Sequence, residues 1–352
     1  MPVFILIVKS SPGAQYESRL AMTDKNWAKF WEKAWGETNQ SPNADPPNPP
    51  PPTGDLYMEV RYGGSSRLFS LQEDGRLREL SSGVIAEMPE PVRSAWLEKA
   101  ERLRRKHYGE LIPWEEAKQA IPLKRVVTVV DLETGYAFRA QRRAGSNHAD
   151  MQPLTRADTA TMKHIYGGKW SWKRRAVLVL ADGRKIAASM HGMPHGGDGI
   201  PDNGFSGHFC IHFLGSTTHK AGAEDTAHQY MVHRAAGKTE LFIAESQPDR
   251  LAELFFESLH QQDRQLLYRL LADAPQHRAS EYERWMDHLD SVRPEKKKKK
   301  EDYRNLLEAE LRLKAALYAR GGGVREAVFQ VKCVRDSAEG RWKIADVAHD
   351  GQ

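Results

Sequence analysis

The chain has 352 residues, with 52 lysines and arginines against 47 aspartates and glutamates, and a net charge of +5 at pH 7. A mean hydropathy of −0.65 and 40% hydrophobic residues predict a soluble globular protein, and exclude a disordered or membrane-embedded chain. The run Lys296–Lys300 accounts for the whole positive excess, so nothing indicates a specific nucleic-acid-binding surface. The length allows about two or three domains.

The cysteine content and the beginning of the chain limit its class further. Two cysteines, Cys210 and Cys333, are too few for a disulfide scaffold or a four-cysteine zinc site. No apolar run approaches the roughly 18 residues of a membrane-spanning helix. The apolar stretch Val3–Val8 lacks a preceding basic region and a following cleavage site, and therefore predicts a strand instead of a signal peptide. A complete start would predict a cytoplasmic protein.

Residues 1–108 are predicted to form an α/β domain. Trp27, Trp31 and Trp35 recur at helical spacing after a Thr23-Asp24 cap, and we expect their rings to pack onto a sheet. The other expected elements are a proline-rich loop at 42–52, a hairpin of strands 56–62 and 68–71, and a helix at 91–107.

Residues 109–238 are predicted to form a β-rich domain. The dipeptide Asp182-Gly183 between two apolar runs is a strong hairpin signal, and Thr155 is a helix cap. Strands are expected at 125–132, 136–141, 176–180, 185–190 and 207–214, and helices at 157–165 and 224–236.

Residues 245–352 are predicted to form a small α+β domain. Helices are expected around 251–271 and at 303–318, followed by strands at 327–334 and 341–347. The segment LAELFFESLHQQDRQLLYRLL and the last two strands resemble the ketosteroid-isomerase-like cone, a resemblance that implies a fold and no activity. Lys296–Lys300 is expected to be an exposed connector between helices, with weak attraction to anionic wall polymer or lipid. The whole chain is therefore predicted to be an α+β multidomain protein, with its β-rich central domain between an α/β domain and an α+β cone.

Histidines gather around one of the cysteines. Nine of the 14 histidines lie between His148 and His233. Because alternate residues of a strand share a face, His208, Cys210 and His212 are predicted to point one way, with their neighbours in the core. A glycine- and proline-rich loop at 192–206 precedes this strand.

Pairing of the two strands around that loop would bring His191 or His195 close to Cys210. A thiol needs a nearby base or cation to act as a nucleophile at neutral pH. The cluster therefore predicts Cys210 as a nucleophile and His195 or His191 as its base.

This pattern resembles the L,D-transpeptidase domain of bacterial cell-wall enzymes, over about residues 124–235. That family has a His-Gly at a strand end, a variable loop, and then Ser-His-Gly-Cys followed by an apolar residue and Arg. This sequence has His191-Gly192 and His195-Gly196, and then Gly207-His208-Phe209-Cys210-Ile211-His212; the segment VVTVVDLETGYAFRA resembles the family's first strand pair.

The resemblance implies acyl transfer or hydrolysis on cell-wall peptide, in an extracytoplasmic location. Cys210 would take the acyl group, His191 or His195 would be its base, and His208 would match the histidine two residues before the cysteine. His212, which stands where the family has Arg, is assigned to substrate binding with Asn203 and Ser206. The sequence departs from the family pattern at Gly207, Phe209 and His212.

Two other interpretations stay open. His191, His195, His208, Cys210 and His212 are plausible soft ligands for zinc, which would make the protein a metal-binding hydrolase instead of one without a cofactor. The segment 146–150 resembles the His…Asp ligand pair of cell-wall D,D-carboxypeptidases, but its spacing is too short. The third interpretation is a non-catalytic cell-wall or assembly module.

Overall fold

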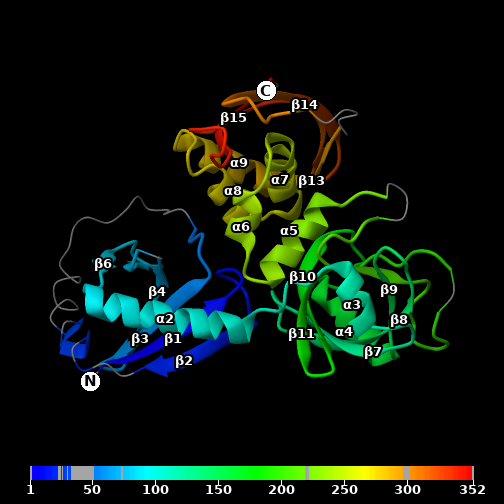
Figure 1. Ribbon diagram of the computed structural model, residues 1–352, viewed down its shortest axis with the longest axis horizontal. Coiled ribbons are helices and arrows are strands. Elements are labelled where there is room, and N and C mark those ends of the chain that lie inside the picture. Colours follow the sequence, from blue (N-terminus) through cyan, green and yellow to red (C-terminus); the bar gives the residue numbers. More distant parts are fainter. Residues whose placement is uncertain are drawn as a thin grey trace.

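The computed structural model contains helices and three separate β-sheets, so the chain has a mixed α and β architecture (Figure 1). None of the helices in its described ranges is both long and apolar enough to span a membrane. The described residues are 2–22, 25, 27–29, 31–32, 51–72, 74–197, 199–218, 222–295 and 301–350. The Thr23-Asp24 cap, Trp35, most of the loop 42–52 and the run Lys296–Lys300 lie outside them.

The N-terminal sheet has six strands in the order β2-β1-β3-β4-β5-β6, and each neighbouring pair is antiparallel. This is an α+β arrangement and differs from the α/β arrangement predicted for residues 1–108, which needs parallel strands. Helix α2 (Glu90–His107) crosses one face of the sheet (Figure 1). The strands are β1 (Val3–Lys9), β2 (Glu17–Met22), β3 (Leu56–Tyr62), β4 (Ser65–Leu71), β5 (Arg76–Glu79) and β6 (Ile85–Glu87).

Tryptophan rings fill the space between this sheet and its helices. Trp27 and Trp31 lie on helical backbone, are buried, and place their ring centroids 5.8 and 6.1 Å from Phe4 of β1. The ring of Trp96 of α2 also packs against Phe4, at 5.5 Å, and lies 6.2 Å from that of Trp27. The prediction that the tryptophan face packs onto a sheet is confirmed for the two described tryptophans.

The central part is a closed barrel of six strands in the order β10-β11-β12-β9-β8-β7. Its interior is apolar, with Phe138, Phe209 and Phe213 fully buried. The predicted hairpin at Asp182-Gly183 joins β10 to β11, and both residues have positive φ, as a two-residue turn requires. The elements are α3 (Trp114–Ala120), β7 (Val126–Asp131), β8 (Ala137–Ala144), β9 (Ala149–Pro153), α4 (Arg156–Ile165), β10 (Arg174–Ala181), β11 (Arg184–His191) and β12 (Phe209–His212).

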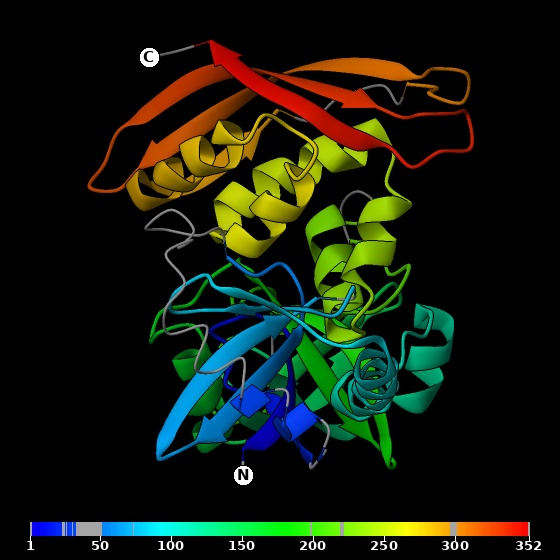
Figure 2. The same ribbon diagram turned by 90° about the vertical axis from the view of Figure 1, so that its left-hand side faces the viewer.

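The C-terminal part places helices against one face of a four-stranded antiparallel sheet, β13-β14-β15-β16 (Figure 2). Two shorter helices, α5 (Thr226–Ala235) and α6 (Thr239–Ala244), connect it to the barrel. The remaining elements are α7 (Pro248–Gln261), α8 (Arg264–Leu270), α9 (His277–His288), β13 (Leu289–Pro294), β14 (Glu308–Ala319), β15 (Val324–Val334) and β16 (Lys343–Asp350).

The helix predicted at 303–318 is wrong, because most of this segment forms strand β14. Alternate residues from Ala309 to Leu317 are buried, with exposed or half-buried residues between them. Alanine, leucine, glutamate, lysine and arginine are good helix formers, but the two-residue period fits a sheet with one covered face. Pairing with β15 along eleven residue pairs decides the outcome. The run Lys296–Lys300 therefore falls between two strands in the chain order, and not between helices.

One apolar core joins the barrel to the C-terminal part. Leu178 and Ala187, on the outer face of β10 and β11, belong to the same buried cluster as Tyr230 of α5. That cluster continues through Phe255 of α7 to Phe329 of β15. The outer face of β10 and β11 is therefore covered by α5, which packs in turn against α7. The neighbouring strands β12 and β9 carry the candidate site on the outer face of the barrel.

Candidate functional site

Strand β12 divides its side chains between the barrel core and the outer wall. Phe209 and Ile211 are buried in the barrel interior, and Cys210 and His212 alternate with them. The predicted division of faces is therefore confirmed. Cys210 is 4% exposed, so its thiol lies below the surface and is covered by neighbouring segments.

The loop 192–206 returns to β12 through a short backbone bridge between His195 and His208. The amide of His195 donates to the carbonyl of His208 at 3.0 Å, and the amide of His208 donates back at 2.8 Å. Gly207 has φ +83°, and a Cβ there would lie 2.3 Å from the carbonyl oxygen of His195. Glycine at this position is what allows the two segments to approach each other.

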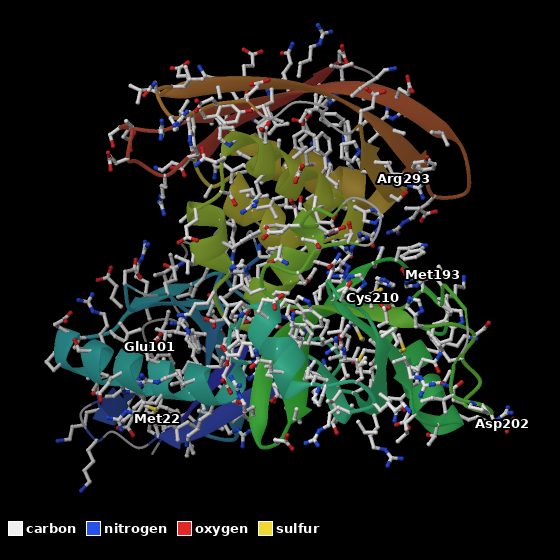
Figure 3. The ribbon with its side chains drawn as sticks, turned by 45° about the vertical axis from the view of Figure 1, so that its right-hand side comes forward. Met22, Glu101, Met193, Asp202, Cys210 and Arg293 are labelled. Carbon is white, nitrogen blue, oxygen red and sulfur yellow. The ribbon has the colours of Figure 1, made fainter. Side chains whose placement is uncertain are left out.

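This bridge places an imidazole beside the thiol. Nε2 of His195 lies 3.3 Å from Sγ of Cys210, and Nδ1 of His195 lies 3.0 Å from the carbonyl oxygen of Met193. A carbonyl oxygen only accepts hydrogen bonds, so Nδ1 carries the ring hydrogen and Nε2 offers its lone pair to the thiol. Figure 3 shows Met193 and Cys210 on the side of the barrel that faces the C-terminal part.

His191, the other predicted base, lies next to this pair. Its ring centroid is 5.1 Å from that of His195 and 4.7 Å from Trp172. Nδ1 of His191 is buried and has no hydrogen-bond partner in the described part of the chain. Burial first, and then the charges of His195 and Arg174, lower the pKa of His191 well below 6.5, which keeps this ring neutral.

The thiol itself is held in its protonated form. Burial, followed by the negative charge of Asp150, raises the pKa of Cys210 far above its ordinary value. Oδ1 of Asp150 lies 3.8 Å from Sγ, because Asp150 of β9 and Cys210 of β12 are directly opposed in the ladder. A resting thiolate is therefore disfavoured, and reaction requires a base that takes the proton as the new bond forms.

Asp150 brings two further histidines to the site. Nε2 of His148 lies 3.2 Å from Oδ1 of Asp150, and Nε2 of His208 lies 3.7 Å from the same oxygen. The sequence prediction set aside the His148 and Asp150 pair because of its short spacing. The strand pairing of β9 with β12 brings the pair to Cys210. The available signal in the sequence was that His148 and Asp150 alternate with an apolar residue at the start of a strand.

A column of imidazoles continues behind the thiol. The ring of His212 stacks on His148 at 4.4 Å and on His228 of α5 at 3.8 Å. Nδ1 of His212 is 3.0 Å from the hydroxyl of Ser216, and Nδ1 of His228 is 2.8 Å from that of Ser189. Burial, followed by the charge of His212, lowers the pKa of His228 well below 6.5, so the ring of His228 is neutral. Sequence reasoning missed His228, which comes from a separate helix.

The two remaining predicted site residues lie in the loop. Asn203 is buried, and its amide donates to Oε1 of Gln152 at 3.2 Å and to the carbonyl of Pro153 at 2.8 Å. Its Oδ1 accepts from the amide of Phe205, so the side chain fixes the loop to the barrel. Ser206 is exposed at the end of the same loop.

Comparison with models of known protein families and with curated proteins finds no match for this chain. The class of the site is therefore argued from its geometry. A buried thiol, an oriented imidazole base and a nearby carboxylate with further imidazoles are the groups from which a function is inferred.

Proposed function

We propose that the protein is a cysteine-dependent acyl transferase or hydrolase that acts on peptide carbonyls, with cell-wall peptide as its substrate class. The observation that carries the proposal is the 3.3 Å separation of Sγ of Cys210 and Nε2 of His195, with the ring hydrogen held on Nδ1 by Met193. Cys210, His195 and the Met193 carbonyl thus supply a nucleophile, a base and a group that orients the base.

The proposed reaction has two halves. Nε2 of His195 takes the proton of the Cys210 thiol while Sγ forms a bond to the carbonyl carbon of the substrate. The tetrahedral intermediate then breaks its bond to the leaving amine, which receives that proton from His195, and a thioester remains on Cys210. An incoming amine or water attacks the thioester, gives its proton to His195 and restores the thiol.

The cell-wall substrate rests on the resemblance to L,D-transpeptidases. Phe209 replaces a glycine of the family, and its ring points into the barrel and away from the thiol, which is compatible with the resemblance. At Gly207, where the family has serine, the backbone of His195 leaves no room for a Cβ, so the backbone here differs from one that carries serine. The helices and antiparallel sheet of the C-terminal part likewise support a ketosteroid-isomerase-like cone as a fold.

The proposal predicts a thioester adduct on Cys210. Incubation with soluble cell-wall peptide stems should add the mass of the acyl portion to the intact protein, and a peptide map should place it on Cys210. Cys210→Ala should lose the adduct and all turnover. Cys333→Ala is the matched control, because Cys333 is buried in the C-terminal sheet, and it should keep both. Turnover that survives in Cys210→Ala would contradict the proposal.

A zinc hydrolase is the second candidate. Cys210 belongs to three sets of possible ligands, and within each set the ligand atoms all lie within 4.8 Å of one another. Chelation distinguishes the two candidates. A cysteine acyl transferase keeps its activity in EDTA, whereas a zinc hydrolase loses it and regains it when zinc is added. A non-catalytic module would form no adduct under either condition.

Removal of the carboxylate opposite the thiol should make Cys210 more reactive. Asp150→Asn deletes the charge that opposes thiolate formation, so we expect about tenfold faster alkylation by iodoacetamide at neutral pH in EDTA. Mass spectrometry of the Cys210 peptide measures the rate. Asp202→Asn is the control, since Asp202 lies in the same part of the chain but is exposed (Figure 3), and it should leave the rate unchanged. An unchanged rate in Asp150→Asn would show that burial alone keeps the thiol protonated.

A further inference from the structure

The carboxylate oxygen Oδ1 of Asp150 lies at the centre of a set of metal-ligating atoms. It is 3.2 Å from Nε2 of His148, 3.7 Å from Nε2 of His208 and 3.8 Å from Sγ of Cys210. The ligand atoms of Asp150, His208 and Cys210 also lie within 4.8 Å of one another. Each of these side chains is buried or half-buried, so water does not separate them freely.

The separations from Asp150 are those expected between neighbouring ligands of a zinc site; Asp150, His208 and Cys210 form one compact group, and His148 joins it through its contact with Asp150. Zinc bonds of about 2.0–2.2 Å to nitrogen and oxygen and about 2.3 Å to sulfur place tetrahedral ligands about 3.3–3.6 Å apart. The three distances from Asp150 fall within a few tenths of an ångström of that range. Thiolate, imidazole and carboxylate form a donor set that suits zinc.

The tautomer of His148 points to the same centre. Nδ1 of His148 lies 2.8 Å from the carbonyl oxygen of Thr217, which only accepts, so Nδ1 carries the hydrogen of the neutral ring. Nε2 of His148 is therefore the nitrogen that faces the Asp150 carboxylate, and a cation could replace the proton between these two atoms. A histidine whose outer nitrogen binds a carbonyl is the usual form of a metal ligand.

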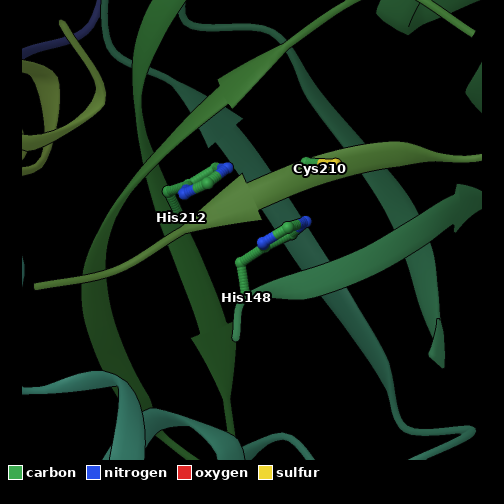
Figure 4. Close-up of side chains that lie close together, drawn as sticks. All are labelled: His148, Cys210 and His212. Atoms are coloured by element: carbon green, nitrogen blue, oxygen red, sulfur yellow. The ribbon is translucent and has the colours of Figure 1, made fainter. Parts of the chain in front are cut away.

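His212 is not included among the proposed metal ligands. Figure 4 shows its ring beside the ring of His148 and the side chain of Cys210, and the ligand atoms of these three residues also lie within 4.8 Å of one another. However, the rings of His148 and His212 are stacked with only 19° between their planes. Two nearly parallel stacked rings do not direct lone pairs at one ion, because each lone pair lies in its own ring plane. His212 therefore supports His148 from behind.

We propose that His148, Asp150, His208 and Cys210 bind a zinc ion that withholds the Cys210 thiol from reaction. Binding displaces the thiol proton to solvent and leaves the sulfur as a zinc-bound thiolate. His195 is outside the proposed ligand set, so the base and the metal would compete for the same sulfur. The role of zinc as a reversible inhibitor rests on the proposed acyl transfer, whereas zinc binding itself does not.

The test uses the full chain, freed of metal, with Zn²⁺ or Co²⁺ as the only addition. One equivalent of Zn²⁺ should bind in competition with a chromophoric chelator and slow alkylation of Cys210 at least tenfold. Co²⁺ should give the near-ultraviolet absorption of a cobalt–thiolate bond. His148→Gln and His208→Gln should each weaken zinc binding at least about tenfold. His212→Gln and His195→Asn, if their far-ultraviolet circular dichroism is native, should bind zinc as the unmodified protein does.

Two results would overturn the zinc proposal. Absence of stoichiometric zinc binding, or alkylation that zinc does not slow, excludes the site. If His212→Gln weakens binding as much as His148→Gln while His208→Gln does not, the ligand set is wrong. Loss of acyl transfer in a protein that still binds zinc and shows the cobalt band would instead count against the proposed function alone.

Discussion

Replacement of His195 by asparagine is expected to lower the rate of acylation of Cys210 by about 10²- to 10⁴-fold, the usual contribution of a positioned general base. Burial keeps the thiol protonated, so the reaction has no thiolate to use once the base is absent. Asparagine keeps a polar side chain in the loop but has no lone pair of comparable basicity. Acyl-enzyme formation, followed by intact-mass spectrometry under single-turnover conditions, measures the effect.

His191→Asn is the matched control, because it removes the other candidate base from the same wall. We expect the acylation rate of His191→Asn to stay within about tenfold of the unmodified rate. His195, and not His191, makes the contacts with the Met193 carbonyl and the Cys210 sulfur. If His191→Asn loses as much activity as we expect for His195→Asn, while His195→Asn remains active, then the base is His191. Equal, small losses in both variants would remove general-base catalysis from the mechanism.

Acidification should destabilise the folded chain through His107, at the end of α2. Burial lowers the pKa of this ring from 6.5 to about 4, with Asp55 opposing the effect and Lys185 adding to it. Above pH 6.5 the ring is neutral in both states and contributes no pH dependence. Between pH 6.5 and 4, His107 binds a proton in the unfolded chain but stays neutral in the folded chain. The contribution of His107 therefore lowers the free energy of unfolding by up to roughly 3 kcal/mol over this range.

Urea denaturation followed by tryptophan fluorescence at several pH values between 7 and 4 measures this loss. His107→Phe should show roughly 3 kcal/mol less acid destabilisation, although it also loses the contact of Nδ1 with the Ser18 hydroxyl and starts from a lower stability at neutral pH. His164→Phe, which removes an exposed histidine of α4, should keep the full acid dependence. Identical acid profiles for His107→Phe and the unmodified protein would refute the assignment.

Local patterns in the sequence predicted those features that depend on neighbouring residues. The two-residue alternation around Cys210 gave the faces of β12, and Asp182-Gly183 gave the turn between β10 and β11. Thr155 caps α4 as predicted, in a reciprocal pair with Asp158. Each of these signals acts within a few residues, where sterics and backbone hydrogen bonds leave few alternatives.

Features that depend on distant strand pairing were not predictable in the same way. Asp150 faces Cys210 only because β9 and β12, which are separated in the chain by α4, β10, β11 and the loop 192–206, are neighbours in the barrel. His228 reaches the site because α5 packs on the outer wall. The helix predicted at 303–318 follows the helix-forming composition of this segment, whereas the two-residue period of its apolar residues and its pairing with β15 make it strand β14.

The barrel wall and the C-terminal part share one apolar core, so the two parts depend on each other for their burial. His228 is on a helix whose other side packs against α7, so the back of the site belongs to both halves. A barrel transplanted alone into another protein would carry the thiol but expose the apolar wall behind it. The barrel is therefore not an independent folding unit, and a protein that acquires its site must also acquire the C-terminal helices that cover it.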